Sequence, residues 1–428
     1  MKEEKTDNKI KLSYELLWKF IIRPPRDVYP ISYLGYSNFR YKDKHYMRRD
    51  FDLISSQGYK MKCSLIEPEP MYRPSKEMPI VVYLHGNSSS RLEGLRTLST
   101  LLPKNINLFI VDMPGCGLSE GEYISLGYYE SKDVGMIIDF LENLPGIGKI
   151  GIWGRSMGAA TALIYAHKDR RVKAICMDSP FANFCRLAKE LTLKNINLPE
   201  FLINGALRII RSTILSKNGM DIYKLNPIDE AEKAFQPAIF IHAINDQLIN
   251  LQHCIDIFNI YGGEKSLKCS EIGGHNSKRP KRITKDVGNF FAEYLANDKN
   301  EFIFDNKFIQ NKISEGDKDE EQIYNMGEYY QSQIYNNNKN NKINNINNDN
   351  DTKNNINNKG NDNDIDIDKS YDFQIGEIPQ EKYISQKEEE EKNKLDEIKN
   401  ILINISEKDM QKDNNSEINT TNKEKSNK

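Results

Sequence analysis

A lone serine between two glycines, placed where an apolar run meets an alanine-rich one, limits the possible folds of this chain more than any other feature. The stretch KIGIWGRSMGAATALIYA covers residues 149–166. Its apolar start indicates a buried strand and its end indicates a helix. Gly154 and Gly158 flank Ser156 two residues away on either side. We expect glycine there because the turn brings strand and helix too close together for a β-carbon. The pattern therefore predicts a strained turn that presents the Ser156 hydroxyl at the end of a strand.

Composition divides the 428 residues into a globular part and a polar tail. Apolar runs alternate with Gly and Pro through residue 298, whereas asparagine, aspartate, lysine and glutamate dominate residues 299–428. Such a tail buries too little apolar surface to offset the entropy cost of ordering, so we expect disorder there. The remainder predicts a lead-in (1–45) and one large domain (46–298).

Charge, cysteine spacing and hydropathy argue against several classes of protein. A net charge of −2 offers no general basic surface for nucleic acid. The six cysteines form no C-x-x-C pair, so we expect reduced thiols, and neither a zinc site nor a disulfide framework. No apolar run reaches the ~18 residues of a membrane span, and no secretory signal is evident. We expect a soluble cytoplasmic protein without metal or cofactor.

Apolar, β-branched runs alternate with helical patterns along the domain. Strands are expected within 51–55, 60–66, 79–86, 107–115, 150–153, 172–181, 237–246 and 266–272, and helices within 92–102, 128–144, 159–166, 251–261 and 284–295. The first two strands form a hairpin around a glycine turn. A hairpin followed by alternating strands and helices predicts an α/β fold with a mostly parallel sheet and helices on both faces.

The interval 181–236 interrupts this alternation because it is too long for a plain crossover between two strands. Four apolar residues in it share one helical face, namely Ile203, Leu207, Ile210 and Ile214. Three basic residues, Arg208, Arg211 and Lys217, lie elsewhere on the same helix. Three interpretations stay open. The segment is a helix packed on the sheet, a small helical cap over a pocket, or a basic amphipathic face that contacts a membrane.

A nucleophilic serine needs a base that accepts its proton. His275 follows the last expected strand, on a loop behind two glycines that permit a tight turn. His167 and His253 lie in expected helices, where packing or surface roles are commoner. We therefore predict that His275 is the base for Ser156.

The base in turn needs a carboxylate that orients it. Asp246 comes just after a buried strand, and His242, Asp246 and Ile249 keep a spacing often seen around such an acid. Asp178 also ends a strand downstream of the serine and is the alternative. Asp112 precedes the serine, and we expect it to stabilise the PGCG turn that follows it.

The tetrahedral intermediate of acyl transfer needs fixed N–H donors for its oxyanion. The amide of Met157 begins the helix after the serine, where the helix dipole also favours negative charge. The second donor is expected in the LHGNSSS stretch, at the amide of Asn87. We expect His85 to shape this loop rather than to act as a base.

Five motifs in a fixed order resemble one large family of enzymes. VVYLHGNSSS, VDMPGCGLSEG, IGIWGRSMGAATAL, MDSPF and GGHNSKRP are similar to those of the α/β-hydrolase superfamily, and more narrowly of its serine-aminopeptidase-like branch of mostly uncharacterised intracellular hydrolases. IIRPPRDVYP (21–30) resembles the lead-in of a eukaryotic subgroup of that branch. The likeness covers about residues 10–298 and implies an α/β-hydrolase fold with Ser156, Asp246 and His275 as its triad. Relatives include esterases, monoacylglycerol lipases and depalmitoylating thioesterases.

The sequence thus predicts a serine hydrolase that cleaves carboxylic esters or thioesters through an acyl-enzyme. Its substrate would be a small acyl ester, a lipid or an acylated protein, and aminopeptidase activity is less favoured. Two alternatives stay open, namely a depalmitoylating thioesterase or lipase at a membrane surface, and a binding module without catalysis.

In the tail, four residues have heptad-like spacing, namely Leu395, Ile398, Leu402 and Ile405. The stretch is too short for a convincing coiled coil, so either solvated chain or a partner-binding helix fits.

Overall fold

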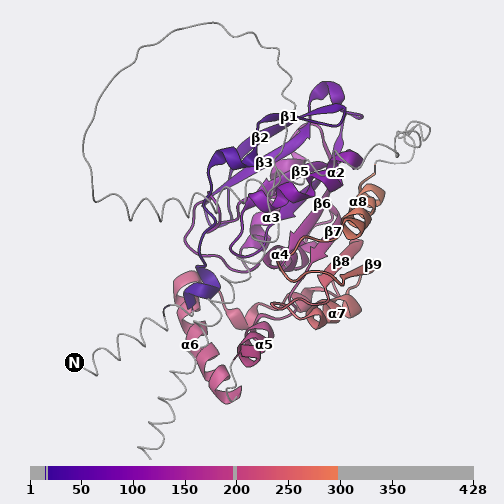
Figure 1. Cartoon of the computed structure of the whole chain (residues 1–428). Coiled ribbons are helices and arrows are strands. Elements are labelled where there is room, and N and C mark those ends of the chain that lie inside the picture. Colours follow the sequence, from indigo (N-terminus) through magenta and orange to yellow (C-terminus); the bar gives the residue numbers. More distant parts are fainter. Residues whose placement is uncertain (1–14, 16–17, 196–199, 297–428) are drawn as a thin grey trace, which may run out of the picture.

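The structure, a computed structural model, describes residue 15, residues 18–195 and residues 200–296 (Figure 1). The expected disordered tail (299–428), with its heptad-like stretch, lies outside the described residues.

Within the described residues, a nine-stranded sheet forms the centre of the molecule, in the order β1-β2-β3-β5-β4-β6-β7-β8-β9. Its strands are β1 (Asn38–Tyr41), β2 (Lys44–Ile54), β3 (Lys60–Pro68), β4 (Met78–Leu84), β5 (Asn107–Val111), β6 (Ile147–Arg155), β7 (Val172–Asp178), β8 (Ala238–Ala243) and β9 (Lys265–Ser270). β1, β2 and β3 pair antiparallel, as does β3 with β5. The pairs from β5 through β4, β6, β7 and β8 to β9 are all parallel. The predicted mostly parallel sheet is confirmed.

Helices cover both faces of this sheet (Figure 1). These helices are α2 (Leu98–Leu101), α3 (Glu130–Glu142), α4 (Met157–Ala166), α7 (Leu251–Ile260) and α8 (Lys281–Leu295). The helices α5 (Phe184–Asn195) and α6 (Glu200–Asn218) lie at one end of the molecule (Figure 1). Side chains alternate between the two faces along a strand. In β4, accordingly, Ile80 and Val82 pack in the core with α3, α4 and α7, whereas Val81 and Tyr83 pack in the core with α2 and α8. This two-sided burial explains why the central strands are almost continuously apolar.

Two local features differ from the sequence analysis. The edge strand β1 was not predicted, and the helix expected within 92–102 is a 3-10 helix (Arg91–Thr97) followed by the single turn of α2. Gly94 lies so close to the sheet that a β-carbon there would come within 2.4 Å of the Ile110 Cγ2 atom. Glycine also disfavours a regular α-helix. Close packing of this segment on β5 therefore takes the place of the expected helix.

The interval 181–236 contains α5 and α6, which lie at the end of the molecule opposite β1 (Figure 1). The four apolar residues predicted to share a face of α6 are all buried. We define the apical cluster as the group of buried apolar residues that includes the α6 residues Ile210 and Ile214. Its members are Trp18, Ile22, Cys116, Ile124, Leu126, Met157, Ala160, Phe181, Phe184, Ile210, Ile214, Met220, Ile222, Leu225 and Ile249. All of these residues lie outside the strands, and this favours the hypothesis of a cap over that of a helix packed on the sheet.

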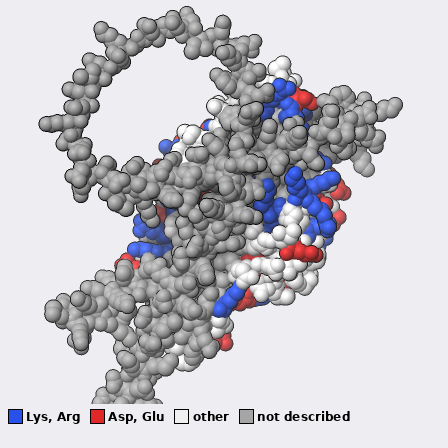
Figure 2. Space-filling view, in the orientation of Figure 1, with Lys and Arg blue, Asp and Glu red and all other residues white. Residues whose placement is uncertain are grey.

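Two of the three basic residues of α6 have partners within the molecule. Arg211 forms an ion pair with Asp221 at 2.6 Å, and the Lys217 ammonium lies 4.5 Å from the centroid of the Trp18 ring. Across the described residues, no helix is long and apolar enough to cross a membrane. On the face seen in Figure 2, basic and acidic side chains lie close to one another.

One buried carboxylate makes a pH dependence of stability predictable. Asp133 in the first turn of α3 accepts a hydrogen bond from the Ser56 amide at 2.7 Å, while its Oδ2 atom is buried without a hydrogen-bond partner. Burial raises the pKa of Asp133 to about 6, although the bonds from Ser56 oppose this shift. The folded protein therefore binds this proton more tightly than the unfolded chain does. It follows that the carboxyl lowers stability as the pH rises through this range.

We compare the free energy of unfolding of the wild type with that of Asp133→Asn. We expect the wild-type value minus the variant value to fall by about 1 kcal/mol between pH 5 and pH 8. The variant keeps an acceptor for Ser56 and removes the titrating group. Urea unfolding of both proteins at the two pH values measures the difference. A difference that is equal at both pH values would contradict the raised pKa.

Candidate active site

The turn between β6 and α4 holds Ser156 in an unusual backbone conformation. Its φ of 52° and ψ of −114° lie in a region that residues other than glycine rarely adopt. A β-carbon on Gly154 would lie 2.1 Å from the carbonyl oxygen of Gly158, and one on Gly158 would lie 2.0 Å from that of Leu84. Both contacts are with backbone, which cannot move aside cheaply. Glycine is therefore required at both positions, for the reason expected from the sequence.

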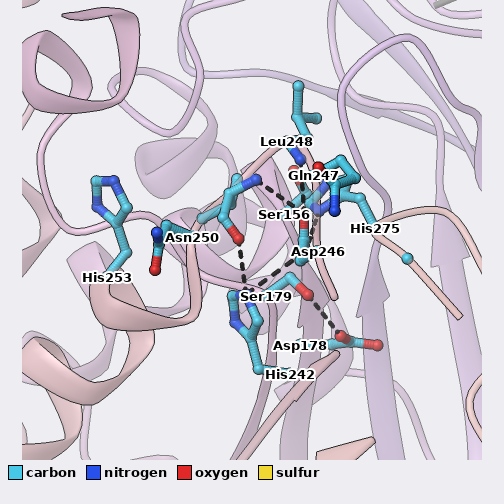
Figure 3. Close-up of polar contacts among 12 residues, drawn as sticks. Ser156, Asp178, Ser179, His242, Asp246, Gln247, Leu248, Asn250, His253 and His275 are labelled. Carbon is cyan, nitrogen blue, oxygen red and sulfur yellow. Dashed lines mark hydrogen bonds and ion pairs between the residues drawn. The ribbon is translucent and has the colours of Figure 1, made fainter. Parts of the chain in front are cut away.

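Three side chains predicted to act together lie in one hydrogen-bonded chain (Figure 3). The Ser156 hydroxyl lies 3.0 Å from Nε2 of His275, and Nδ1 of His275 lies 2.7 Å from Oδ2 of Asp246. They follow β6, β9 and β8, three parallel strands whose carboxyl ends meet at one edge of the sheet. Each of the three residues is less than a tenth exposed. The arrangement allows His275 to accept a proton from Ser156 while Asp246 fixes the orientation of the ring.

The Asp246 carboxylate is held from two directions. Its Oδ1 accepts hydrogen bonds from the amides of Leu248 and Ile249, at 2.9 and 2.8 Å. Burial opposes ionisation, but His275 and the Ile249 amide prevail and lower the pKa of Asp246 to about 2. The carboxylate therefore stays charged throughout the neutral pH range.

His242 adds a second imidazole beside this carboxylate. Its Nε2 lies 2.9 Å from the Ile249 carbonyl oxygen and 3.5 Å from Oδ2 of Asp246. Both neighbours are acceptors, so Nε2 carries the proton. Burial lowers the pKa of His242, which keeps the ring neutral. The spacing from His242 to Asp246 was the sequence signal for this contact.

Asp178, the alternative acid, has a different partner. Its carboxylate forms an ion pair with the buried Arg279 guanidinium at 2.7 Å. The backbone carbonyl of Asp178 accepts a hydrogen bond from the Ser156 amide at 2.8 Å. Asp178 thus supports the serine turn through its main chain, and its carboxylate balances the charge of Arg279.

His85 and Asp112 hold neighbouring loops. His85 accepts a hydrogen bond from the Met113 amide at Nε2 (3.1 Å), which leaves Nδ1 to donate to the Gly86 carbonyl oxygen (2.8 Å). Asp112 accepts the Leu118 amide, directly after the PGCG turn. These contacts agree with the structural roles expected for both residues.

Two further histidines, His253 and His167, face acidic side chains outside the triad. His253, in α7, accepts the amide of Ala182 at 3.0 Å and lies 3.1 Å from a Glu190 carboxylate oxygen. His167, just after α4, lies 3.4 Å from a carboxylate oxygen of Glu230. Neither imidazole forms a hydrogen bond with Ser156.

The two residues predicted to donate to an oxyanion lie at different borders of the site. Met157 is the first residue of α4. Asn87 is exposed, in the loop that follows β4. A β-carbon on its neighbour Gly86 would lie 3.7 Å from the Ser156 Cβ, so this loop passes directly beside the serine. The oxyanion role of the two amides stays a prediction.

The lead-in segment fastens the loops around the site, a role that the sequence analysis did not predict. The Arg26 side chain donates to the Ser119 carbonyl oxygen at 2.8 Å. Asp27 accepts a hydrogen bond from the Ser90 hydroxyl, and the Tyr29 hydroxyl donates to Asp112, both at 2.7 Å. The conspicuous RPPRDVYP stretch therefore acts as a strap across the loops that follow β4 and β5.

In the described part of the chain, no group of three His, Cys, Asp or Glu side chains is arranged to hold a metal ion.

Comparison with known proteins agrees with this architecture. Residues 79–225 match the model of the alpha/beta hydrolase fold family. Together with the sheet order and the serine turn, this match shows that the chain has an α/β-hydrolase fold. The narrower resemblance to the serine-aminopeptidase-like branch stays a prediction.

Similar proteins come from bacteria and a virus. The chain is 28% identical over 228 residues to the uncharacterized protein YqkD of Bacillus subtilis, covering 53% of this chain and 72% of that protein. It is 26% identical over 238 residues to the putative alpha/beta hydrolase L404 of Acanthamoeba polyphaga mimivirus, covering 53% and 76%. Among solved structures, it is similar to the Pyrococcus furiosus esterase Pf2001, with a TM-score of 0.48, 19% identity and coverage of 59% of this chain and 92% of that one.

Proposed function

We propose that this protein is a serine hydrolase that cleaves carboxylic esters through an acyl-enzyme intermediate. The observation that supports it is the buried hydrogen-bonded chain from the Ser156 hydroxyl through His275 to Asp246. The strained backbone of Ser156 supports the same proposal, because strain of this kind is concentrated at functional sites.

In the proposed reaction, the Ser156 oxygen attacks the acyl carbonyl carbon while Nε2 of His275 takes the serine proton. The tetrahedral intermediate carries an oxyanion that the amides of Met157 and Asn87 stabilise. Its collapse breaks the bond to the leaving alcohol, which receives the proton from His275. Water then attacks the acyl-enzyme with His275 as base, and the acid is released while Ser156 regains its proton. Asp246 stays ionised and stabilises the imidazolium in both halves.

Apolar side chains beside the triad support an acyl group as the recognised part of the substrate. Met157 follows the serine and Ile249 lies three residues after the acid, and both belong to the apical cluster. The partly buried Leu248 packs against the same cluster. Oxygen esters and thioesters share such an acyl group and differ in the leaving group. A lipid-acting or depalmitoylating thioesterase at a membrane surface is therefore the second candidate.

Reaction with a fluorophosphonate, followed by peptide mapping, tests the nucleophile in the full chain. We expect one adduct per chain, on the peptide that contains Ser156, and none after heat denaturation. Hydrolysis of p-nitrophenyl esters from acetate to palmitate, with matched thioesters alongside, then separates a short-chain esterase from a lipase or thioesterase. Absence of both the adduct and any turnover would favour a binding module without catalysis.

A further inference from the structure

Two buried arginines converge on the backbone carbonyl of the proposed base. Nη2 of Arg155 donates to the His275 carbonyl oxygen at 2.5 Å, and Nη2 of Arg279 approaches it at 3.4 Å. Both guanidiniums are less than a tenth exposed. The loop that carries His275 is therefore anchored by Arg279 from the same loop and by Arg155 from elsewhere in the fold. Arg155 is the residue directly before the nucleophile.

The second arm of Arg155 reaches Glu93, on the short helix that follows the loop after β4. Nη1 of Arg155 lies 3.0 Å from Oε1 of Glu93. Oε2 of Glu93 accepts a hydrogen bond from the Gly86 amide at 3.1 Å, and Oε1 also accepts one from the Tyr83 hydroxyl at 3.0 Å. Gly86 precedes Asn87, the residue expected to donate to the oxyanion. One carboxylate–guanidinium pair thus joins the oxyanion loop to the loop of the base.

Both members of this pair are charged. Burial opposes ionisation of Glu93, but Arg155 and Arg96 hold the pKa of its carboxyl well below the usual range. Burial likewise disfavours the Arg155 cation, and Glu93 and Asp178 hold its pKa above the usual range. A buried ion pair is often no more stabilising than apolar residues of the same volume. A contribution to stability therefore does not by itself explain why a charged pair is buried here. Its contacts with the loop of His275 and the loop of Asn87 offer an explanation.

We propose that the Glu93–Arg155 pair is a positioning device that sets the spacing between the oxyanion loop and His275. The inference rests on the proposed hydrolase function and deepens it. Arg279 forms no hydrogen bond with the oxyanion loop in the described part of the chain. Its guanidinium binds Asp178, Ser179 and the carbonyl of Gly274. Arg155 and Glu93 are positioning residues that act through the backbone and do not touch the reacting atoms.

The test compares Arg155→Met and Glu93→Gln with the wild type, at a temperature where circular dichroism shows all of them folded. We expect kcat for ester hydrolysis to fall about 10- to 100-fold with KM changed less than about threefold, because misplaced groups weaken the transition state more than substrate binding. The double variant should lose about as much as one single variant, since both break the same link. Arg155→Lys, which keeps the charge but lacks the fork, should give an intermediate kcat.

Arg171→Met is the matched control. Arg171 forms ion pairs with Asp139, Glu142 and Asp169, and none of these residues contacts the triad. We expect this variant to lose stability and to keep the wild-type kcat. A folded Arg155→Met protein with wild-type kcat and wild-type fluorophosphonate labelling would overturn the positioning role alone. A wild-type protein without turnover or labelling would overturn the hydrolase function, and this inference with it.

Discussion

Replacement of Ser156 by alanine is expected to lower kcat for ester hydrolysis by about 10⁵- to 10⁶-fold and to abolish the fluorophosphonate adduct. The variant removes the atom that forms the acyl-enzyme. It leaves the oxyanion donors in place, so a small rate above that of water should remain. The measurement is the burst and steady-state release of p-nitrophenol by the full chain, made at concentrations high enough to detect the residual rate.

The control for this variant is Ser179→Ala. Ser179 has a φ of 55°, close to the 52° of Ser156, so alanine would adopt a positive φ at both sites. The Ser179 hydroxyl accepts a hydrogen bond from Arg279 and has no contact with His275. We expect less than about a tenfold change in kcat. If both alanine variants lose activity equally, distortion of the fold rather than loss of the nucleophile explains the loss.

The central sheet and the candidate triad were predictable because each depends on short-range patterns. Strands buried on both faces are continuously apolar, and the active residues of such a sheet follow directly at the carboxyl ends of its strands. Ser156, Asp246 and His275 all obey this rule. The glycines at 154 and 158 were readable for a similar reason, since the close contacts that require them arise within one turn and the neighbouring strand.

The ionic support of the site was not predictable, because its partners are far apart in the sequence. Glu93 and Arg155 are 62 residues apart, and Asp178 and Arg279 are 101 residues apart. Nothing local to either residue distinguishes a buried ion pair from a pair of solvated charges. The one available signal was position, since Arg155 and Asp178 each end a strand directly after a run of apolar residues and glycines. A charge at that point is buried and needs a partner.

We therefore expect the two sides of the site to have different physical roles. The apical cluster supplies apolar side chains from loops and from α4, α5 and α6. The polar side contains the Glu93–Arg155 pair, in which Arg155 donates to the His275 carbonyl and Glu93 accepts from the Gly86 amide. Substitutions in the apical cluster should alter acyl-chain preference, whereas substitutions of Glu93 or Arg155 should alter kcat for every ester.

Replacement of Asp246 by asparagine is expected to lower kcat by about 10⁴-fold while the fold stays intact. The amides of Leu248 and Ile249 bind one oxygen of Asp246 and would orient the asparagine oxygen toward themselves. The amide nitrogen would then face Nδ1 of His275, which must become an acceptor. That tautomer places the proton on Nε2, where it prevents transfer from Ser156. Steady-state kinetics and melting curves of the variant measure both effects.

Asp178→Asn distinguishes this explanation from a general need for negative charge near the site. It leaves the buried Arg279 without its carboxylate, so we expect a loss of about 3 to 5 kcal/mol in stability. The tautomer of His275 is unaffected, and the folded fraction should keep kcat within about tenfold of the wild type. The reverse pattern, with a 10⁴-fold loss in Asp178→Asn and a small loss in Asp246→Asn, would transfer the role of triad acid to Asp178. The 2.7 Å bond between Asp246 and His275 is the reason we expect the first pattern.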